Sequence, residues 1–385
     1  MDYQRLLSDE DEQLKIRQRA SAILNKELNV SPRKKDEDVH NSWIKGPTKA
    51  TTTYPSGNCQ FFDEFGFLHV KNFASSQEIL DMKHQMETLA HTWDPNGEGL
   101  TVFRTDEKQI EEQGSTDYFL ESANKVHFFA ESGAMKEGKL KQEFLNDKIS
   151  ALNKAGHGMH VQPGAFHNYT KSDKIRNLVA ELGWEDPVVP QSMYIFKQAR
   201  VGAEVTSHQD STFLYTTPKQ SCLGLWLALD DATITNGCLW VRPKSHREKT
   251  RTKFVKNPAH FGVEQIQKRS NIAKGDLKES QMIFVDEDVP EDDEKIDWVG
   301  KIPSIKGMSP WESLFEKGFI PVECKKGDLV VFPGELDHLS LPNVSDQQRH
   351  TFQLHLVEGQ KAGVTWSETN WLQYPKTDSF LRLNA

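Results

Sequence analysis

Short runs of β-forming residues dominate the second half of this chain. Glycine, proline and aspartate turns separate the runs, and no crossover helices are predicted between them. The run over residues 221–232 is apolar on both faces, so we expect it to be a central strand. Many short strands of this kind predict a sandwich or jelly roll. The runs are VVPQSMYIFKQ, SCLGLWLALDDA, GCLWVRP, GDLVVFPG and HTFQLHLVEG.

The region before the β runs looks mainly helical and is expected to pack on one face of the β core. Ser75 and Glu78 have the spacing of a capping box, and apolar residues recur at helical spacing from Ile79 to Leu89. Just upstream, the alternation over residues 65–70 predicts a strand. We therefore expect a mainly β fold with flanking helices.

The chain divides into an extension and one large domain. Residues 1–57 are rich in charge, Ser, Thr and Lys, so we expect a charged, partly disordered extension, with a short helix over about 10–28. Residues 58–385 form the domain, and a long insert at about 247–326 interrupts its β pattern. The insert contains an acidic run at 285–295, which is either a solvated loop or part of a lid over a site.

Composition excludes several classes of function. The formal charge of −9 offers no general basic surface to nucleic acid or anionic lipid. The four cysteines include no CxxC pair, which argues against a disulfide scaffold and fits a reducing compartment. Neither a signal peptide nor a long apolar segment is visible, so we expect a cytoplasmic protein without membrane contact. A peroxisomal location is less favoured, because the C-terminus lacks the usual signal and the N-terminal signal is imperfect.

The stretch HQDSTFLY places an imidazole and a carboxylate two residues apart. In an extended segment His208 and Asp210 point to the same side. Together they supply two of the three ligands of the facial triad that holds Fe(II) with open coordination positions. A surface ion pair or a turn cap is the alternative explanation, and it is the commoner use of such a pair.

A third ligand and an anion-binding residue occur far downstream. His338 directly follows a hydrophobic strand and a Pro-Gly turn, and strand ends are where sites are assembled. Arg349 begins the next strand. Its planar guanidinium suits a carboxylate such as that of an oxo acid.

These residues occur within motifs that resemble the phytanoyl-CoA dioxygenase family of Fe(II)- and 2-oxoglutarate-dependent oxygenases. The similarity runs from about Phe61 to Trp371. The opening motif and a His-x-Asp are common, whereas QGSTDYFL, QSMYIFKQ and HQDSTFLYT in this order are specific. The motifs are FFDEFGFLHVKNF, QGSTDYFLESANKVHFF, NKAGHGMH, QSMYIFKQ, SHQDSTFLYT, LWLALDDATITNGCLWVRPKSH, HLSLPNVSDQQR and NWLQ.

The resemblance implies a double-stranded β-helix, a cupin-like jelly roll, with Fe(II) held by His208, Asp210 and His338. It implies that 2-oxoglutarate and dioxygen are used to hydroxylate a C–H bond of a small-molecule or acyl substrate, with release of succinate and CO2 and with ascorbate as reductant. The residues that it assigns to the 2-oxoglutarate site are Arg349, Ser340, Lys154, Met193 and Trp226.

The sequence departs from the family at one turn. The family usually has Pro-Gly-Ser-His where this chain has Pro243-Lys244-Ser245-His246. Losing the glycine changes the preferred backbone angles of the turn. The departure therefore concerns turn geometry rather than metal binding.

Other interpretations of these residues stay open. The chain is alternatively a catalytically silent jelly-roll binding module, or a zinc-dependent hydrolase that uses the same three ligands and leaves Arg349 unexplained. His157 and His160 form a pair that is more often structural than metal-binding. His355 has the strand parity of Arg349, which favours an interior or supporting position over ligation. By default, Trp226 is a core aromatic residue and Lys154 a solvated lysine.

Overall fold

A large antiparallel sheet forms the centre of the computed structural model, which describes residues 9–27, 56–95, 101–102, 116–137, 139–261, 281–287 and 296–384. Within these residues the sheet has nine strands, in the order β1-β15-β10-β17-β7-β6-β3-β2, with β19 also paired to β7. Only the contact between β2 and β3 is parallel among these pairs. The strands are β1 Leu68–Val70, β15 Leu329–Pro333, β10 Leu223–Ala228, β17 Thr351–Glu358, β7 Pro187–Ile195, β6 Leu152–His157, β3 Val126–Ala130, β2 Thr101–Val102 and β19 Leu381–Arg382.

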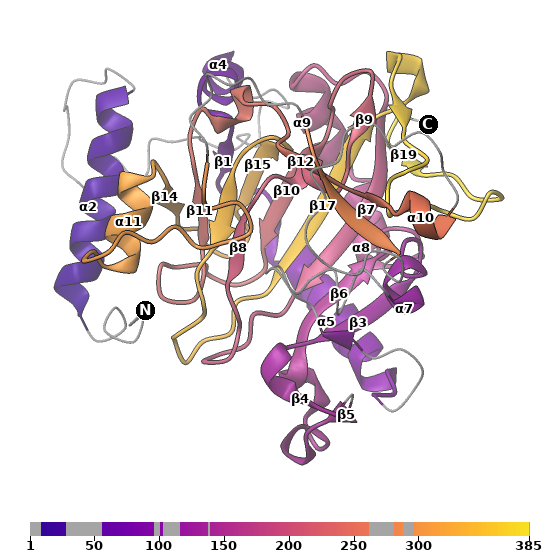
Figure 1. Cartoon of the computed structure of the whole chain (residues 1–385), viewed down its shortest axis with the longest axis horizontal. Coiled ribbons are helices and arrows are strands. Elements are labelled where there is room, and N and C mark those ends of the chain that lie inside the picture. Colours follow the sequence, from indigo (N-terminus) through magenta and orange to yellow (C-terminus); the bar gives the residue numbers. More distant parts are fainter. Residues whose placement is uncertain are drawn as a thin grey trace.

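A second, smaller sheet packs against one face of the large sheet (Figure 1). Its described strands run in the order β14-β11-β16-β8 and are antiparallel. Side chains of β10 and β15, among them Trp226 and Phe332, share a core cluster with Leu239 of β11 and Leu339 of β16. Two facing antiparallel sheets confirm the predicted jelly-roll core. The strands are β14 Ile320–Val322, β11 Leu239–Val241, β16 His338–Ser340 and β8 Val205–His208.

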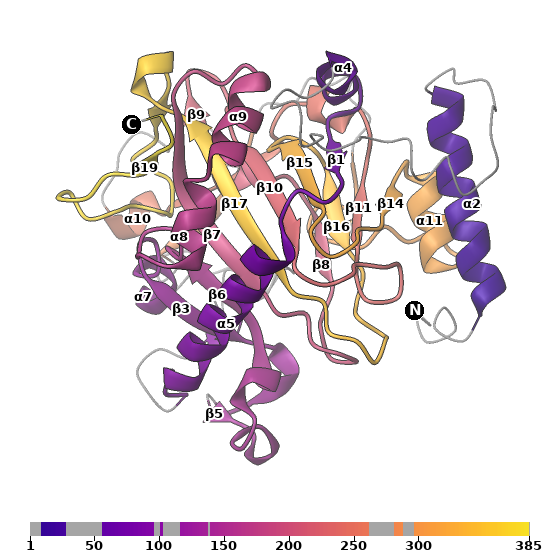
Figure 2. The same cartoon turned by 180° about the vertical axis from the view of Figure 1, so that it is seen from behind.

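Helices cover the other face of the large sheet (Figure 2). The leucines of β10 that alternate with Trp226 point into this layer, together with buried residues of the three main helices. The predicted capping box is present, because Ser75 and Glu78 satisfy each other's backbone N–H at the start of α5. The helices are α5 Ser76–Thr92, α8 Ala165–Thr170 and α9 Asp173–Glu181.

Two expectations for the region before residue 188 were wrong in part. Residues 65–70 are not one strand, because α4 (Ser56–Phe65) ends at Phe65 and only β1 is extended. Phe61 and Phe65 lie four residues apart, which is helical spacing, and their rings are 4.6 Å apart. Gly66 ends the helix with a φ of 80°. In addition, β3 and β6 belong to the large sheet, so this region is mixed rather than mainly helical.

A helix of the N-terminal extension packs beside the small sheet. The predicted helix over residues 10–28 is confirmed as α2, Glu10–Glu27. Ile16 and Ala20 of α2 join the core cluster that contains β14, and Arg17 forms an ion pair with Glu323. Most of the remaining extension lies outside the described residues, so its predicted disorder stays a prediction.

The predicted insert contains regular structure. A two-stranded ribbon and two helices lie within it, and β14 of the small sheet falls near its C-terminal end. Residues 288–295, most of the acidic run, lie outside the described residues, so the choice between loop and lid stays open. The elements are β12 Thr252–Lys256, α10 Pro258–Phe261, β13 Met282–Asp286 and α11 Pro310–Glu316.

The remaining elements are short. They are α7 Asp117–Leu120, the ribbon of β4 Met135–Lys136 with β5 Lys139–Leu140, and the ribbon of β9 Thr216–Thr217 with β18 Thr365–Trp366. Among the described helices, none combines the length and the apolar character needed to span a membrane.

The turn that lacks the family's glycine keeps a glycine-like conformation. Lys244 has a φ of 71° and a ψ of −9°, in the left-handed region that glycine favours. Its backbone N–H donates to the carbonyl of Phe65, and its ammonium lies 5.3 Å from the centre of the Phe65 ring. Lys244 therefore occupies a turn position whose backbone conformation favours glycine.

Candidate metal and cosubstrate site

The strand register lines up a set of residues on the inner face of the large sheet. One row across the sheet joins Gly224, His355 and Gln191 on β10, β17 and β7. Residues two positions along each strand point the same way, so Trp226 and Met193 form part of the next row. These side chains line a cavity of about 370 Å³ between the two sheets.

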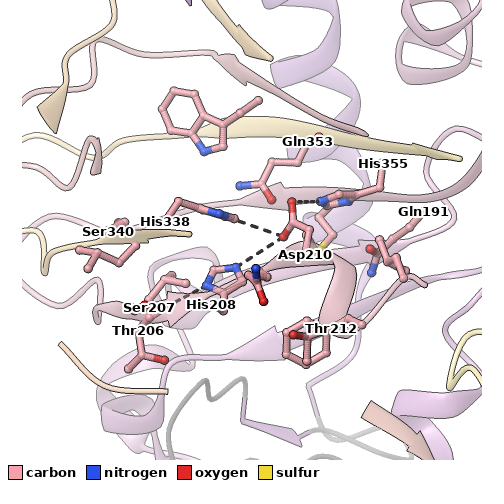
Figure 3. Close-up of a pocket in the computed structure, with 18 of the residues that line it drawn as sticks. Gln191, Thr206, Ser207, His208, Asp210, Thr212, His338, Ser340, Gln353 and His355 are labelled. Atoms are coloured by element: carbon pink, nitrogen blue, oxygen red, sulfur yellow. Dashed lines mark hydrogen bonds and ion pairs between the residues drawn. The ribbon is translucent and has the colours of Figure 1, made fainter. Parts of the chain in front are cut away.

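Two histidines face each other on the small sheet. His208 is the last residue of β8, His338 is the first residue of β16, and the two residues are paired across the strands. Their ring centres are 4.2 Å apart. Gln209 continues the extended backbone, and Asp210 begins a short 3-10 turn over Asp210–Thr212. The structure therefore brings together all three predicted ligands (Figure 3).

Backbone contacts fix which ring nitrogen of each histidine faces Asp210. Nδ1 of His208 donates to the carbonyl of Thr206 at 2.8 Å, and Nδ1 of His338 donates to the carbonyl of Leu336 at 3.0 Å. The two Nε2 atoms therefore face the carboxylate, and they lie 3.5 and 3.8 Å from Oδ1 of Asp210. Such an orienting bond on the second ring nitrogen is typical of histidines that bind metals.

His355 supports the carboxylate from the large sheet. Its Nε2–H donates to Oδ2 of Asp210 at 3.1 Å. The other carboxylate oxygen, Oδ1, is therefore left to face the space between His208 and His338. Gly224 allows this close approach, because a Cβ there would lie 3.1 Å from Oδ2 and 2.9 Å from the Phe332 ring. The strand parity of His355 predicted that its side chain faces the interior and supports the site rather than binding the metal. The hydrogen bond from His355 to Asp210 places it in such a supporting position.

The electrostatics keep Asp210 ionised. Burial favours the neutral acid, but the interactions with the neighbouring imidazoles of His355, His338 and His208 outweigh it and hold the pKa of Asp210 well below its usual range. Burial lowers the pKa of His338 to about 4, and the charge of His208 adds to this effect. Burial also opposes charge on His208, but its hydrogen bond to Asp210 raises the pKa of His208. A carboxylate beside a neutral imidazole is the protonation state that a metal ligand set needs.

Asp337 joins the two histidine strands and was missed in the sequence. Its side chain is fully buried and accepts hydrogen bonds from Ser207 at 2.5 Å and from Arg251 at 2.9 Å. Arg242 and the indole N–H of Trp298 also donate to it, at 3.2 and 3.3 Å. Because Asp337 precedes His338 and Ser207 precedes His208, these bonds hold both histidines in place.

Arg349 lies buried beyond the histidines. It is 2% exposed, it donates to Thr351 at 3.1 Å, and its guanidinium lies 5.3 Å from the Trp226 ring. Within the described residues, its Nε has no hydrogen-bond partner and no carboxylate forms an ion pair with its guanidinium. Burial lowers the pKa of Arg349 to about 10, so the group remains charged at neutral pH. A buried cation without an anion in a cavity fits a carboxylate ligand.

The other predicted cosubstrate residues also line the cavity. Ser340, Met193 and Trp226 do so, and Ser340 donates to the carbonyl of Gly237 at 3.2 Å. Lys154 is 2% exposed, so the default expectation of a solvated lysine is wrong. Its ammonium is 3.1 Å from Nε2 of His157 and 4.9 Å from the centre of the Phe129 ring, and burial lowers its pKa well below the usual range.

A second group of potential ligands has a structural explanation. His69, Cys324 and Asp328 lie together in the described part of the chain. The carboxylate of Asp328 already accepts from Nε2 of His69 and from the backbone N–H groups of Asn72 and Lys325, each at 2.9 Å. These bonds close the turn before β15. The imidazole of His157 contacts Ser122 and Lys154, and that of His160 contacts Ser192 and the carbonyl of Val189.

The site belongs to a class of candidate non-heme iron centres. Two histidines and one carboxylate converge inside a jelly roll, and a buried arginine lies beyond them. The family comparison is consistent with this class. The family profile described as "Phytanoyl-CoA dioxygenase (PhyH)" matches residues 62–351. The chain belongs to the phytanoyl-CoA dioxygenase family.

Several relatives are similar over most of the chain. "Phytanoyl-CoA dioxygenase domain-containing protein 1" of Rattus norvegicus is 36% identical over 318 residues, which cover 82% of this chain and 94% of the relative. "Phytanoyl-CoA dioxygenase" of Arabidopsis thaliana is 34% identical over 317 residues, which cover 82% of this chain and 92% of the relative.

Solved structures are more distant. The epimerase SnoN "in complex with Fe3+, alpha ketoglutarate and nogalamycin RO" is 12% identical with a TM-score of 0.48, covering 84% of this chain and 91% of that chain. EctD from S. alaskensis "with 2-oxoglutarate and 5-hydroxyectoine" is 14% identical with a TM-score of 0.45. The match covers 82% of this chain and 79% of that chain.

Proposed function

We propose that this protein is an Fe(II)- and 2-oxoglutarate-dependent oxygenase in which His208, Asp210 and His338 hold the metal. One observation carries the proposal: two Nε2 atoms and one carboxylate oxygen converge in a cavity that also contains the buried Arg349, which has no carboxylate partner within the described part of the chain. Membership in the phytanoyl-CoA dioxygenase family supports it. A hydrolase that used the same ligands would leave the buried charge of Arg349 without a role.

The large sheet would hold the cosubstrate. Arg349 would bind the distal carboxylate of 2-oxoglutarate through two parallel N–H donors, with Ser340 beside it. Lys154 would supply further N–H donors, while Met193 and Trp226 would form apolar walls. These walls exclude water, which strengthens each ionic contact inside the cavity.

When bound, Fe(II) with 2-oxoglutarate supplies the activation of dioxygen that allows a C–H bond to be hydroxylated, with release of succinate and CO2. The protein's part is to fix the geometry. Asp210 presents a single oxygen because His355 holds the other, and each histidine presents Nε2 because a backbone carbonyl holds Nδ1. Iron held by these three side chains would keep positions open for the cosubstrate and dioxygen.

The substrate would be a small molecule or an acyl compound. Aromatic side chains, including Phe119, Phe213 and Trp371, line part of the cavity. Among its described lining residues Asp210 is the one carboxylate, whereas Arg251, Arg349 and Lys154 are basic. A neutral or anionic apolar substrate therefore suits the cavity better than a cation does.

The test is turnover without a substrate. With Fe(II), ascorbate and dioxygen, the protein should slowly convert 2-oxoglutarate to succinate, and Asp210→Ala should abolish both this conversion and stoichiometric Fe(II) binding while remaining folded. Equal Fe(II) binding by the parent and the Asp210→Ala variant would refute the metal assignment. If the parent shows neither 2-oxoglutarate binding nor succinate formation, the chain is a binding module instead.

A further inference from the structure

A chain of three buried side chains leads from the protein interior to the cavity. Ser122, His157 and Lys154 are each 2% exposed or less. Nδ1 of His157 is 2.7 Å from Oγ of Ser122, and Nε2 of His157 is 3.1 Å from Nζ of Lys154. Both His157 and Lys154 line the cavity that holds the candidate metal ligands.

The hydrogen bonds of this chain have one consistent direction. The single hydroxyl proton of Ser122 is donated to the carbonyl of Phe119 at 2.5 Å, so Oγ must accept from Nδ1–H of His157. A neutral imidazole that is protonated on Nδ1 carries a lone pair on Nε2. That lone pair faces the Lys154 ammonium and accepts from it. Burial, together with the charge of Lys154, lowers the pKa of His157 well below its usual range, which keeps the ring neutral.

The surroundings prevent the imidazole from turning. The rings of Phe119, Phe129 and Trp371 surround it, with centroids 5.6, 5.6 and 4.9 Å away. The backbone N–H of His157 also donates to the carbonyl of Ser122 at 3.0 Å. The packed ring therefore presents Nε2 to Lys154 from a defined position.

Sheet register places Lys154 on the cosubstrate side of the cavity. Lys154 on β6 pairs with Ile195 on β7, which pairs with Thr351 on β17. Thr351 accepts from Arg349. Neighbouring strands are about 4.8 Å apart, so Lys154 lies about 10 Å across the sheet from Thr351. An ammonium has three N–H donors, so donation to His157 is compatible with donation to an anion in the cavity.

We propose that His157, oriented by Ser122, is a positioning residue that directs the Lys154 ammonium toward the carboxylate of 2-oxoglutarate. This inference rests on the proposed function. It assigns no chemical step to His157 or Ser122. Their effect on cosubstrate binding passes through Lys154.

The test is a double-mutant cycle on His157 and Lys154, read as 2-oxoglutarate affinity by anaerobic calorimetry on the Fe(II)-loaded protein. His157→Phe keeps a ring but removes the acceptor, and Lys154→Met removes the ammonium while keeping the chain length. Each should weaken binding about tenfold to a hundredfold, the range for losing a charge-assisted hydrogen bond. The double variant should be no weaker than Lys154→Met alone. Fe(II) stoichiometry should stay unchanged throughout.

Matched variants separate positioning from general damage. His157→Gln places an amide oxygen near the position of Nε2 and should recover most of the affinity. His160→Phe alters another fully buried histidine, which bonds to Ser192 and lies off the cavity lining, and it should leave the affinity unchanged. Ser122→Ala should weaken binding in the same direction as His157→Phe, and it provides the test if the phenylalanine variant does not fold.

The outcomes are distinguishable. A parent that does not bind 2-oxoglutarate would overturn the proposed function and this inference with it. If the parent binds, parent-like affinity in both His157→Phe and Ser122→Ala would overturn the inference alone. Additive losses in the double variant would also overturn it, because His157 would then act independently of Lys154.

Discussion

Arg349→Met isolates the buried charge from the shape of the side chain. Arg349 packs over Trp226, and its Nε has no hydrogen-bond partner among the residues that the structure describes. Methionine fills much of the same space without a charge or a donor. The variant should therefore keep the cavity wall and the metal ligands, so Fe(II) binding should match that of the parent. Its affinity for 2-oxoglutarate should fall steeply.

The magnitude follows from burial. The pKa of Arg349 is lowered from 12.5 to about 10, which corresponds to about 3 kcal/mol against the charged form in the ligand-free protein. A carboxylate that pairs with the guanidinium offsets this cost. Removing one member of a buried charge pair costs about 2 to 5 kcal/mol, which is about 30-fold to about 4,000-fold in affinity. The ligand-free variant should be as stable as the parent, or more stable, because it no longer buries an unpaired charge.

Two measurements check this prediction. Anaerobic calorimetry of the Fe(II)-loaded protein gives the affinity for 2-oxoglutarate, and urea unfolding gives the free energy of the ligand-free fold. Arg349→Lys is the matched control: it keeps the charge but loses the planar fork, so its affinity should lie between those of the parent and the methionine variant. Parent-like affinity in Arg349→Met would refute the anchor. A large loss of ligand-free stability would refute the claim that its charge is unpaired.

Two further predictions concern buried carboxylates outside the metal ligand set. Arg242 and Arg251 share two carboxylate partners, Asp337 and Glu248. Asp337→Ala removes the fully buried one and should lower the free energy of unfolding by about 3 to 5 kcal/mol; a urea-unfolding loss below about 1 kcal/mol would contradict this role. Burial opposes ionisation of Asp328, but bonds from His69 and the backbone outweigh it and lower the pKa of Asp328. The stabilisation by ionised Asp328 is therefore complete above the unfolded pKa of about 4 and is lost as the pH falls through the lower folded pKa. The difference in free energy of unfolding between the parent and Asp328→Asn should shrink in acid. A difference that is unchanged at about pH 3 would refute the assignment.

The strands that carry the site were predictable because their local patterns agree with their tertiary position. The apolar run around Trp226 is the centre of the large sheet, as its two apolar faces predicted. Spacing alone suggested that His208 and Asp210 share a side. His338 was found from its place after a strand and a turn. Each of these patterns spans only a few residues, so it can be recognised in the sequence without knowledge of the fold.

Contacts between distant segments were not predictable. The hydrogen bond from Ser207 to Asp337 joins residues 130 positions apart, and a lone buried aspartate has no local signature. The burial of Lys154 depends on β6 lying inside the sheet, whereas its polar sequence suggested a solvated segment. The strand prediction for residues 65–70 was wrong in part because the alternating pattern overlaps a second pattern, aromatic residues at helical spacing before Gly66. Local periodicity cannot decide such cases when two periods fit the same residues.

The two sheets divide the site between them. His208 and His338 come from the small sheet, whereas Arg349, Lys154 and His355 come from the large sheet or directly precede one of its strands. Under the proposed function the metal belongs mainly to one sheet and the cosubstrate to the other. The bond from His355 to Asp210 is a direct polar link between the large sheet and the metal ligand set. Productive geometry then depends on the spacing of the sheets as well as on the ligands, because a shift of one sheet would move the cosubstrate anchor relative to the metal without removing any ligand.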